Sequence, residues 1–398
     1  MDQFTADKVR VRAHRLARLR AELKARDYAG CVLADAINVR YATGSRNMQI
    51  WTSRNPARYV FVATEGPVVM FEFAGCGHLL DGLETIDEIR NATGWFYFTS
   101  GPNLGARAKQ WSAELAELVR QHGGGNCRLA VDRLNPEGHF ALQAEGIDVF
   151  DGQEVAERAR CIKSDDEVEG ARRALKVCEA GFDRMQETLT PGMTENQVWA
   201  ILNQTNAELG GEYIETRLLS SGPRTNPWFQ ESGERIIEEG DLVAVDADLI
   251  GPGGYFADIS RTFVCGERPA TGEQRALYAL AHDQIAHNLD GLRAGVGFAE
   301  FARNSWNMPD RFLRNRYMAL VHGAGLCGEY PYIPYQTDFD RKGYDGLIEP
   351  NMTLCVESYI GPEDGVEGVK LEQLVVVNEN GPPTPLSDYP FDDRLLGG

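Results

Sequence analysis

Acidic residues inside apolar, strand-forming runs constrain the fold of this chain more than any other feature. In LVAVDADLIGPGGYFADISRTF, Asp246 and Asp248 are two residues apart, so the alternation of side chains along a strand predicts that both lie on one face. Asp258 follows a Gly-Pro-Gly-Gly turn and is expected on the paired strand. Burying such carboxylates without partners is costly, so a bound cation would compensate them.

Acidic residues within apolar runs also occur near the end of the chain. Glu357 in LCVESYI and Glu372 in VKLEQLV are single acids in apolar runs, and His322 in VHGAGLCGEYP stands among small residues. Each acid alone fits a solvated strand face about equally well, and a single histidine is more often structural. Together, five carboxylates and one imidazole are the ligand mix of one or two divalent transition-metal ions.

The spacing of apolar residues along the sequence changes from one region to the next and divides the chain into two parts. A helix is expected at 7–27, then short β-rich runs alternate with a helix at 109–122, which predicts an α/β domain over 1–160. A polar segment, KSDDEVEGARRA, opens a long helix that ends near Leu189. The remaining strands predict an antiparallel-leaning α+β domain over 161–398, with further helices at 194–211, 273–292 and 298–307.

Composition limits the partners of the chain. The 398 residues carry a formal charge of −19, which argues against a surface that binds nucleic acid or an anionic membrane. The N-terminal stretch is charged throughout and no later run of apolar residues is long enough to span a membrane, so we expect a cytoplasmic protein. A small or cationic ligand fits this charge better than a polyanion.

The order and surroundings of these residues resemble those of a known superfamily. The order Asp, Asp, His, Glu, Glu, with GYFADISRT, HGAG, KLE and the helix start IKSDDEVEGAR, is similar to the creatinase/prolidase/methionine aminopeptidase superfamily. The resemblance implies a catalytic domain of the "pita-bread" fold. It also implies a homodimer in which the N-terminal domain of one chain closes over the site of the other and brings Trp51, Arg54 or Arg58 toward a substrate carboxylate.

Three departures distinguish the chain from the peptidases of that superfamily. Leu326 stands where prolidases and aminopeptidases P have a second histidine, Asp248 is an extra acid, and NPWFQ replaces the usual Pro-His pair. The segments INVRYATGSRNMQIW, GEYIETRLLSSGPRTNPWFQESG, VDADL and LCVESYI instead resemble the dimethylsulfoniopropionate lyases of the superfamily.

This narrower resemblance implies a reaction and a set of roles. The reaction is β-elimination of a small zwitterionic carboxylate, dimethylsulfoniopropionate or a related sulfonium or betaine compound, to dimethyl sulfide and acrylate. The cofactor is one or two divalent ions, iron first, with manganese, zinc or cobalt as alternatives. The implied metal ligands are Asp246, Asp248, Asp258, His322, Glu357 and Glu372.

A cationic sulfonium group is attracted to aromatic ring faces, and several aromatic residues are candidates for that contact. Ordinary core packing is the alternative role for each of them. Tyr317 matches a pocket tyrosine of the lyases, and Trp51 and Trp228 lie in polar, turn-rich segments. The candidate substrate-binding residues are Trp51, Trp228, Tyr317, Tyr330 and Tyr332.

The general base is the open question. The acid that the lyases are thought to use, six residues after the metal histidine, is Gly328 here. Glu329, the phenolate of Tyr317, or a hydroxide supplied by the metal centre could replace it, so the candidate catalytic residues are Tyr317, Glu329 and Asp258. Two other functions stay open: a metallohydrolase that cleaves a C–N bond in a small zwitterion or an Xaa-Pro-type peptide, and a non-catalytic binding module.

Overall fold

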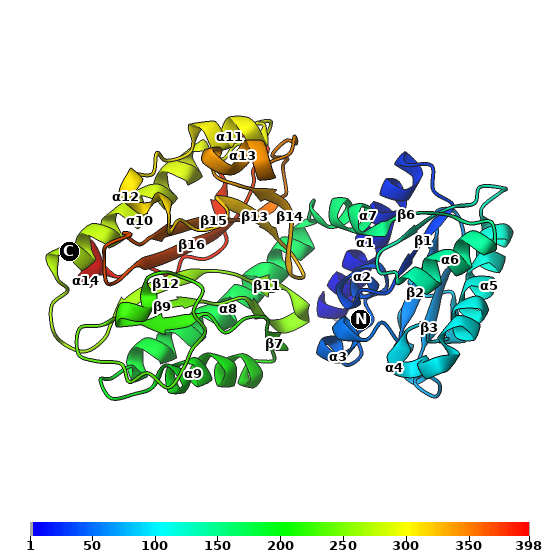
Figure 1. Cartoon of the computed structure of the whole chain (residues 1–398), viewed down its shortest axis with the longest axis horizontal. Helices are drawn as coiled ribbons and strands as arrows, with labels where there is room; N and C mark the ends of the chain where they lie inside the picture. Colours follow the sequence, from blue (N-terminus) through cyan, green and yellow to red (C-terminus); the bar gives the residue numbers. More distant parts are fainter. Residues whose placement is uncertain (1–2, 398) are drawn as a thin grey trace. The chain divides into compact units, whose positions relative to one another are not determined.

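The computed structural model describes residues 3–397, which form two compact units divided after Arg160. The first unit is built on a mixed six-stranded sheet in the order β4-β3-β2-β1-β5-β6 (Figure 1). Its strands are β1 (Gly30–Leu33), β2 (Tyr59–Ala63), β3 (Val68–Glu72), β4 (Glu88–Asn91), β5 (Arg128–Val131) and β6 (Asp148–Asp151).

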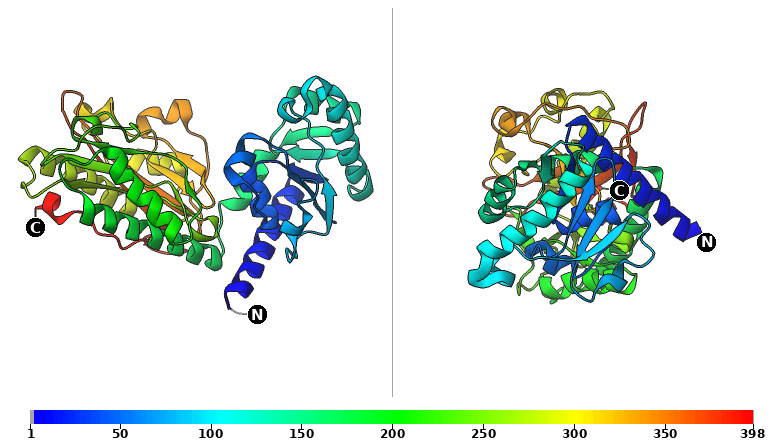
Figure 2. Two further views of the ribbon diagram at one scale, coloured as in Figure 1. Left: turned by 90° about the horizontal axis from the view of Figure 1, so that it is seen from below. Right: turned by 90° about the vertical axis from the view of Figure 1, so that its right-hand side faces the viewer.

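Helices flank this sheet, and the first of them, α1, packs on α7 and α2 within the unit (Figure 2). Trp95, Trp111 and Tyr59 form an aromatic cluster in the core of the unit, with Trp95 stacked on Trp111 at 4.5 Å between ring centroids. The helices are α1 (Gln3–Ala25), α2 (Ala36–Thr43), α3 (Gln49–Arg54), α4 (Tyr97–Ser100), α5 (Leu104–His122), α6 (Pro136–Ala144) and α7 (Gly152–Arg160).

The second unit begins with two helices whose starts are fixed by capping boxes. Ser164 caps α8 (Asp165–Thr188) and Thr194 caps α9 (Glu195–Glu208), and in each case the side chain three residues later bonds back to the cap. Thr271 starts α10 (Gly272–Gly291) in the same way. The shorter helices are α11 (Phe298–Asn304), α12 (Asp310–Leu313), α13 (Gln336–Lys342) and α14 (Asp393–Leu396).

Two antiparallel sheets of this unit matter for the site. One has the order β12-β9-β8, with β8 (Leu219–Ser221), β9 (Leu242–Asp246) and β12 (Ser260–Val264). The other has the order β14-β13-β15-β16-β17, with β13 (Val321–Ala324), β14 (Gly328–Ile333), β15 (Thr353–Ile360), β16 (Val369–Val376) and β17 (Thr384–Pro385). A small third sheet joins β7 (Tyr213–Ile214), β10 (Leu249–Ile250) and β11 (Phe256–Ala257).

Alternate residues of these strands pack into two hydrophobic cores. Leu354 and Val356 of β15 join one core, with the apolar residues of α10 and α11. Cys355 between them joins the other, with the apolar residues of α8 and α9. The predicted fold class, an α/β part followed by an antiparallel α+β part, is confirmed, and each helix expected from the sequence overlaps an observed one. The remaining helices, among them α2, α3, α6 and α7, were not expected.

Candidate metal centre

Neighbouring strands of the five-stranded sheet bring His322, Glu357 and Glu372 together. Glu357 on β15 lies directly opposite Glu372 on β16, and His322 on β13 lies opposite Cys355 on β15. Because residues two apart share a face, Cys355 and Glu357 point to the same side of the sheet. Both glutamates are buried, with side chains 1% and 0% exposed.

Of the three aspartates, Asp246 alone lies in a strand of the three-stranded sheet. Asp258 was expected on the paired strand but lies in the connection between β11 and β12. Asp246 ends β9 and pairs with Ser260 on β12, and Asp258 lies two residues before Ser260. Ser260 Oγ is 2.7 Å from Asp246 Oδ1 and 2.7 Å from Glu372 Oε2, so one hydroxyl links the two sheets at the site.

Asp248 reaches the site by a different route from the one predicted. The expectation of one continuous strand through Asp248 is wrong, because β9 ends at Asp246 and β10 begins at Leu249. Asp248 has φ 42°, a left-handed conformation that aspartate tolerates better than most residues, and Thr216 donates a hydrogen bond to its carboxylate. Asp246, Asp248 and Asp258 nevertheless form a group with ligand atoms within 4.8 Å of one another.

His322 is oriented toward the acids by its other ring nitrogen. Nδ1 lies 3.0 Å from the backbone oxygen of Gly323, which leaves Nε2 directed at the carboxylates. Nε2 is 3.2 Å from Glu357 Oε1, 3.6 Å from Asp258 Oδ2 and 3.7 Å from Glu372 Oε1. Burial alone would lower the pKa of His322, but the hydrogen bond and charge of Glu357 outweigh it and raise that pKa to about 9.

The carboxylates repel one another in a buried place. Burial, and then the charges of Glu372 and Asp248, raise the pKa of Asp258 well above its usual value. Among the described residues, neither Asp258 Oδ1 nor Glu372 Oε1 has a hydrogen-bond partner, although both atoms are buried. Buried oxygens of this kind, gathered around an imidazole, are suited to divalent metal ions, so the residues present fit one or two such ions.

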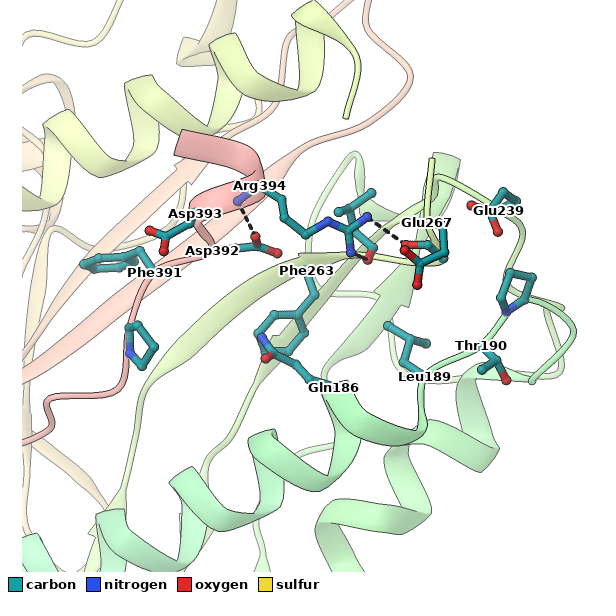
Figure 3. A pocket seen from close by; sticks show the side chains of 14 residues that line it. Gln186, Leu189, Thr190, Glu239, Phe263, Glu267, Phe391, Asp392, Asp393 and Arg394 are labelled. Carbon is teal, nitrogen blue, oxygen red and sulfur yellow. Dashed lines mark hydrogen bonds between the residues drawn. The ribbon is translucent and has the colours of Figure 1, made fainter. Parts of the chain in front are cut away.

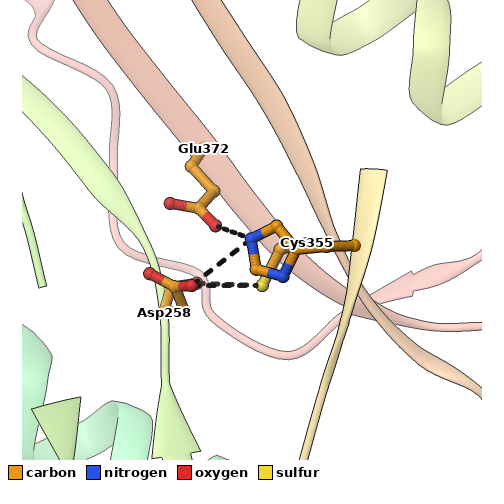
Figure 4. A group of neighbouring side chains, drawn as sticks. Asp258, Cys355 and Glu372 are labelled. Carbon is orange, nitrogen blue, oxygen red and sulfur yellow. Dashed lines mark hydrogen bonds and ion pairs between the residues drawn. The ribbon is translucent and has the colours of Figure 1, made fainter. Parts of the chain in front are cut away.

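Cys355 is a member of the cluster that the sequence did not suggest. Its Sγ lies 3.8 Å from Asp258 Oδ2, and Asp258, His322, Cys355 and Glu372 form a second group with ligand atoms within 4.8 Å of one another. Figure 4 shows the thiol directed toward the carboxyl group of Asp258. Its position two residues before Glu357 on a strand is the signal that could have identified it.

The aromatic residues predicted to contact the sulfonium group do not all lie together. Trp228 is buried in the core, 6.1 Å from the ring of Tyr359, whereas the next residue, Phe229, stacks on Tyr317 at 5.1 Å between ring centroids. Phe229 is 44% exposed and has φ 71°. The aromatic residue of NPWFQ that contacts Tyr317 is therefore Phe229, which the sequence did not single out.

Three other aromatic candidates have neighbours of their own. Tyr330 packs against Phe298 and Tyr344. Tyr332 pairs with His322 across β13 and β14. Trp51, in the first unit, packs edge-on against Phe73 and Phe98, both about 6 Å away.

The two candidates for the general base differ in their surroundings. Glu329 forms an ion pair with Lys163, and the side chains of the two are 0% and 5% exposed. Burial, followed by the charge of Glu357, raises the pKa of Tyr317 well above its usual value. Gly328 is exposed, and a Cβ placed on it would have only one close neighbour, Phe256 at 4.0 Å.

A cavity of about 490 Å³ lies elsewhere in the second unit (Figure 3). Its charged lining is mostly acidic, with Glu239, Glu267, Asp392 and Asp393, and its Arg394 donates to the backbone oxygens of Val264 and Gly266. None of the six candidate ligands lines this cavity, and it does not suit a carboxylate substrate.

The fold and the site together define a metalloenzyme with a carboxylate-rich centre that spans two sheets. The model of metallopeptidase family M24 matches residues 169–379. Two proteins named dimethylsulfoniopropionate lyase DddP are similar over nearly the whole chain. That of Roseovarius nubinhibens is 39% identical over 98% of this chain and 89% of its own length. That of Roseobacter denitrificans is 38% identical over 98% and 88%.

Solved structures agree on the fold. An Xaa-Pro dipeptidase from Bacillus anthracis superposes with a TM-score of 0.76 at 20% identity, covering 96% of this chain and 99% of that one. Dipeptidase PepE from Mycobacterium ulcerans gives 0.74 at 23% identity, covering 96% and 97%. The chain belongs to metallopeptidase family M24 and, within it, to the family of the two DddP lyases.

Proposed function

We propose that the protein is a metal-dependent carbon–sulfur lyase that cleaves dimethylsulfoniopropionate to dimethyl sulfide and acrylate. The observation that carries this proposal is the 39% identity to a dimethylsulfoniopropionate lyase over 98% of the chain. The buried Leu326 supports it, because it stands where the resemblance to peptidases would require a second histidine.

In this reaction a base takes the proton from the carbon next to the substrate carboxylate. The C–S electron pair leaves on sulfur as dimethyl sulfide, and the new double bond gives acrylate. A divalent ion held by Asp246, Asp248, Asp258, His322, Glu357 and Glu372 would stabilise the negative charge that develops at the substrate carboxylate. Iron is the proposed metal, with manganese, zinc or cobalt as substitutes in the same oxygen-rich ligand set.

Aromatic rings would hold the sulfonium group. The exposed ring of Phe229, stacked on Tyr317, offers a face for this cation, and we assign the contact to this pair. Tyr317 is the proposed base, because the Glu329 carboxylate is paired with Lys163. Burial and the carboxylate charges raise the pKa of Tyr317, and a bound divalent ion would offset those charges and favour the phenolate. Trp51 would be supplied by the first unit of the other subunit in a homodimer.

The remaining expectation is the location of the protein in the cell. No helix among the described residues is long and apolar enough to cross a membrane. We propose a cytoplasmic location because all eight cysteines are thiols rather than disulfides, as is usual in the reducing cytosol.

The test is direct. Purified protein loaded with Fe²⁺ or Mn²⁺, with the metal content verified, should release dimethyl sulfide from dimethylsulfoniopropionate, and both chelation and the Glu372→Gln substitution should abolish the release. A fully loaded protein that releases none would contradict the proposal. Release of an amine from small zwitterions or Xaa-Pro peptides would then identify a hydrolase.

A further inference from the structure

A lysine lies inside the cluster of acids. Lys370 is on β16, two residues before Glu372, so the two side chains share a face of the strand. Its side chain is 0% exposed. Its Nζ is 2.7 Å from Glu357 Oε2, 3.3 Å from Glu372 Oε2, 3.4 Å from Asp246 Oδ2 and 2.6 Å from Ser260 Oγ.

Each glutamate directs one carboxylate oxygen at Lys370 and the other at His322. Glu357 directs Oε2 at Lys370 and Oε1 at His322 Nε2, 3.2 Å away. Glu372 directs Oε2 at Lys370, while its Oε1 lies 3.7 Å from His322 Nε2 and has no hydrogen-bond partner among the described residues. The ammonium group therefore occupies one oxygen of each glutamate and leaves the other on the histidine side.

The contacts of the lysine extend beyond the two glutamates. Its Nζ also lies 3.4 Å from Asp246 Oδ2, a third candidate ligand. The ammonium also lies 4.7 Å from the centre of the Tyr317 ring, within the range of a cation–π contact. One charge thus contacts three ligand candidates and the proposed base.

We propose that Lys370 is a positioning residue of the metal centre, which restrains Glu357 and Glu372 to offer a single oxygen each to a metal ion on the His322 side. Like the proposed function, this role requires a metal centre, but it does not require lyase chemistry. Removing the ammonium would free the second oxygen of each glutamate and let either residue bind through both oxygens.

Cobalt(II) reports this change, because the visible absorption of the ion depends on the number and arrangement of its ligands. Full-length wild type, Lys370→Met, Lys370→Gln and Lys370→Arg would be loaded with Co²⁺. The glutamine variant can still donate hydrogen bonds to the same oxygens, which guards against a methionine variant that does not fold. Arg235→Met, which removes a cation from a pair with Asp241 outside the cluster, is the matched control.

The methionine and glutamine variants should shift the visible bands, lower the absorption per bound cobalt and bind the metal about 10- to 100-fold more weakly, as substitution of outer partners of metal ligands typically does. The arginine variant and the control should keep the wild-type spectrum. A purely structural role would lower the stability of metal-free and metal-loaded protein alike and leave the spectrum unchanged.

Spectra of Lys370→Met and Lys370→Gln that superimpose on the wild-type spectrum would overturn the role of Lys370. A wild type that binds no Co²⁺ would overturn both this role and the metal centre of the proposed function. Altered spectra in variants of a wild type that releases no dimethyl sulfide would support the role of Lys370 and contradict the lyase function alone.

Discussion

At the scale of single residues, Gly328 stands where the resemblance to the lyases predicts an acidic general base. A Cβ there meets nothing closer than Phe256 at 4.0 Å, so a larger side chain fits. We expect Gly328→Asp to raise the rate of dimethyl sulfide release, by up to about 100- to 10,000-fold, the usual contribution of a general base. Gly328→Asn has the same shape and no basic oxygen. Equal rates for the two variants in steady-state assays would contradict this expectation.

Tyr317 and Glu329 can be distinguished by substitutions that keep their shapes. Tyr317→Phe removes only the hydroxyl and keeps the ring beside Lys370, so kcat should fall about 100- to 10,000-fold with the fold intact. Glu329→Gln leaves Lys163 without its charge partner in a buried place and should instead destabilise the protein, by about 3–5 kcal/mol. Steady-state kinetics and urea denaturation of both variants give the comparison. The opposite pattern would make Glu329 the base.

His322 makes the stability of the metal-free protein depend on pH. Its pKa is about 9 in the folded chain and near 6.5 for a free side chain, so the protonated imidazole favours the folded state. This stabilisation is complete below pH 6.5 and is lost as the pH rises to about 9. The raised pKa of Asp258 acts in the same direction. Chelator-treated wild type should therefore lose stability across this window.

His322→Gln should lose less stability between pH 6.5 and 9, as measured by urea unfolding at fixed ionic strength. Adding Mn²⁺ should restore the stability of the wild type at high pH, because the metal binds the neutral imidazole and the ionised carboxylates. The same slope in wild type and His322→Gln would show that other groups control the titration.

At the scale of elements, Arg261 of β12 links the segment around Tyr389 and Pro390 to β16 by hydrogen bonds. Its five hydrogen bonds go to Ser260, Glu372, Gln373, Tyr389 and Pro390, and its guanidinium lies 4.5 Å from the ring centre of Phe391. A lysine can donate only three bonds, so Arg261→Lys should cost about 3–6 kcal/mol at about 1.5–3 kcal/mol for each bond lost.

Denaturation followed by tryptophan fluorescence measures this loss. Arg235→Lys is the control, because within residues 3–397 the Arg235 side chain donates hydrogen bonds only to Ser221 and Asp241, and a lysine can keep both. Equal destabilisation by the two substitutions would show that the network around Arg261 adds nothing specific. A loss of bound metal in Arg261→Lys would further link this arginine to the backbone that carries Glu372.

The elements themselves could be predicted from local chemistry. Capping boxes at Ser164, Thr194 and Thr271 set the observed helix starts, and the apolar runs around Glu357 and Glu372 predicted β15 and β16. The left-handed Asp248 could not be predicted, because alternation assumes that a strand continues until a turn residue stops it.

The clustering of the candidate ligands could be predicted from the sequence, but the contacts that support them could not. Acids in apolar strands are conspicuous, whereas the charge that balances them depends on register. Lys370 stands at two-residue spacing from Glu372, a signal that places it on the ligand face, but which oxygens it would contact follows only from the pairing of β15 with β16. Phe229 was missed because the backbone conformation that buries Trp228 and exposes its neighbour is not encoded in any local pattern.

At the scale of the whole molecule, the proposed homodimer makes a prediction about shared sites. If the first unit of one subunit completes the centre of the other, Trp51→Ala and His322→Gln inactivate different halves of each site. Each variant alone should be nearly inactive. Mixed, dissociated and reassociated, they should regain activity, because one of the two sites in a mixed dimer combines an intact Trp51 with an intact His322.

Random reassociation makes half of the dimers mixed, and half of the sites in those dimers intact, so about one quarter of the wild-type activity per subunit should return. Light scattering on each sample must show dimers before and after mixing. If Trp51 instead serves the centre of its own chain, every site in every dimer carries at least one defect, and mixing restores nothing. Dimethyl sulfide release from the mixture, measured against each variant treated identically alone, therefore decides whether the catalytic unit works with the first unit of its own subunit or of its neighbour.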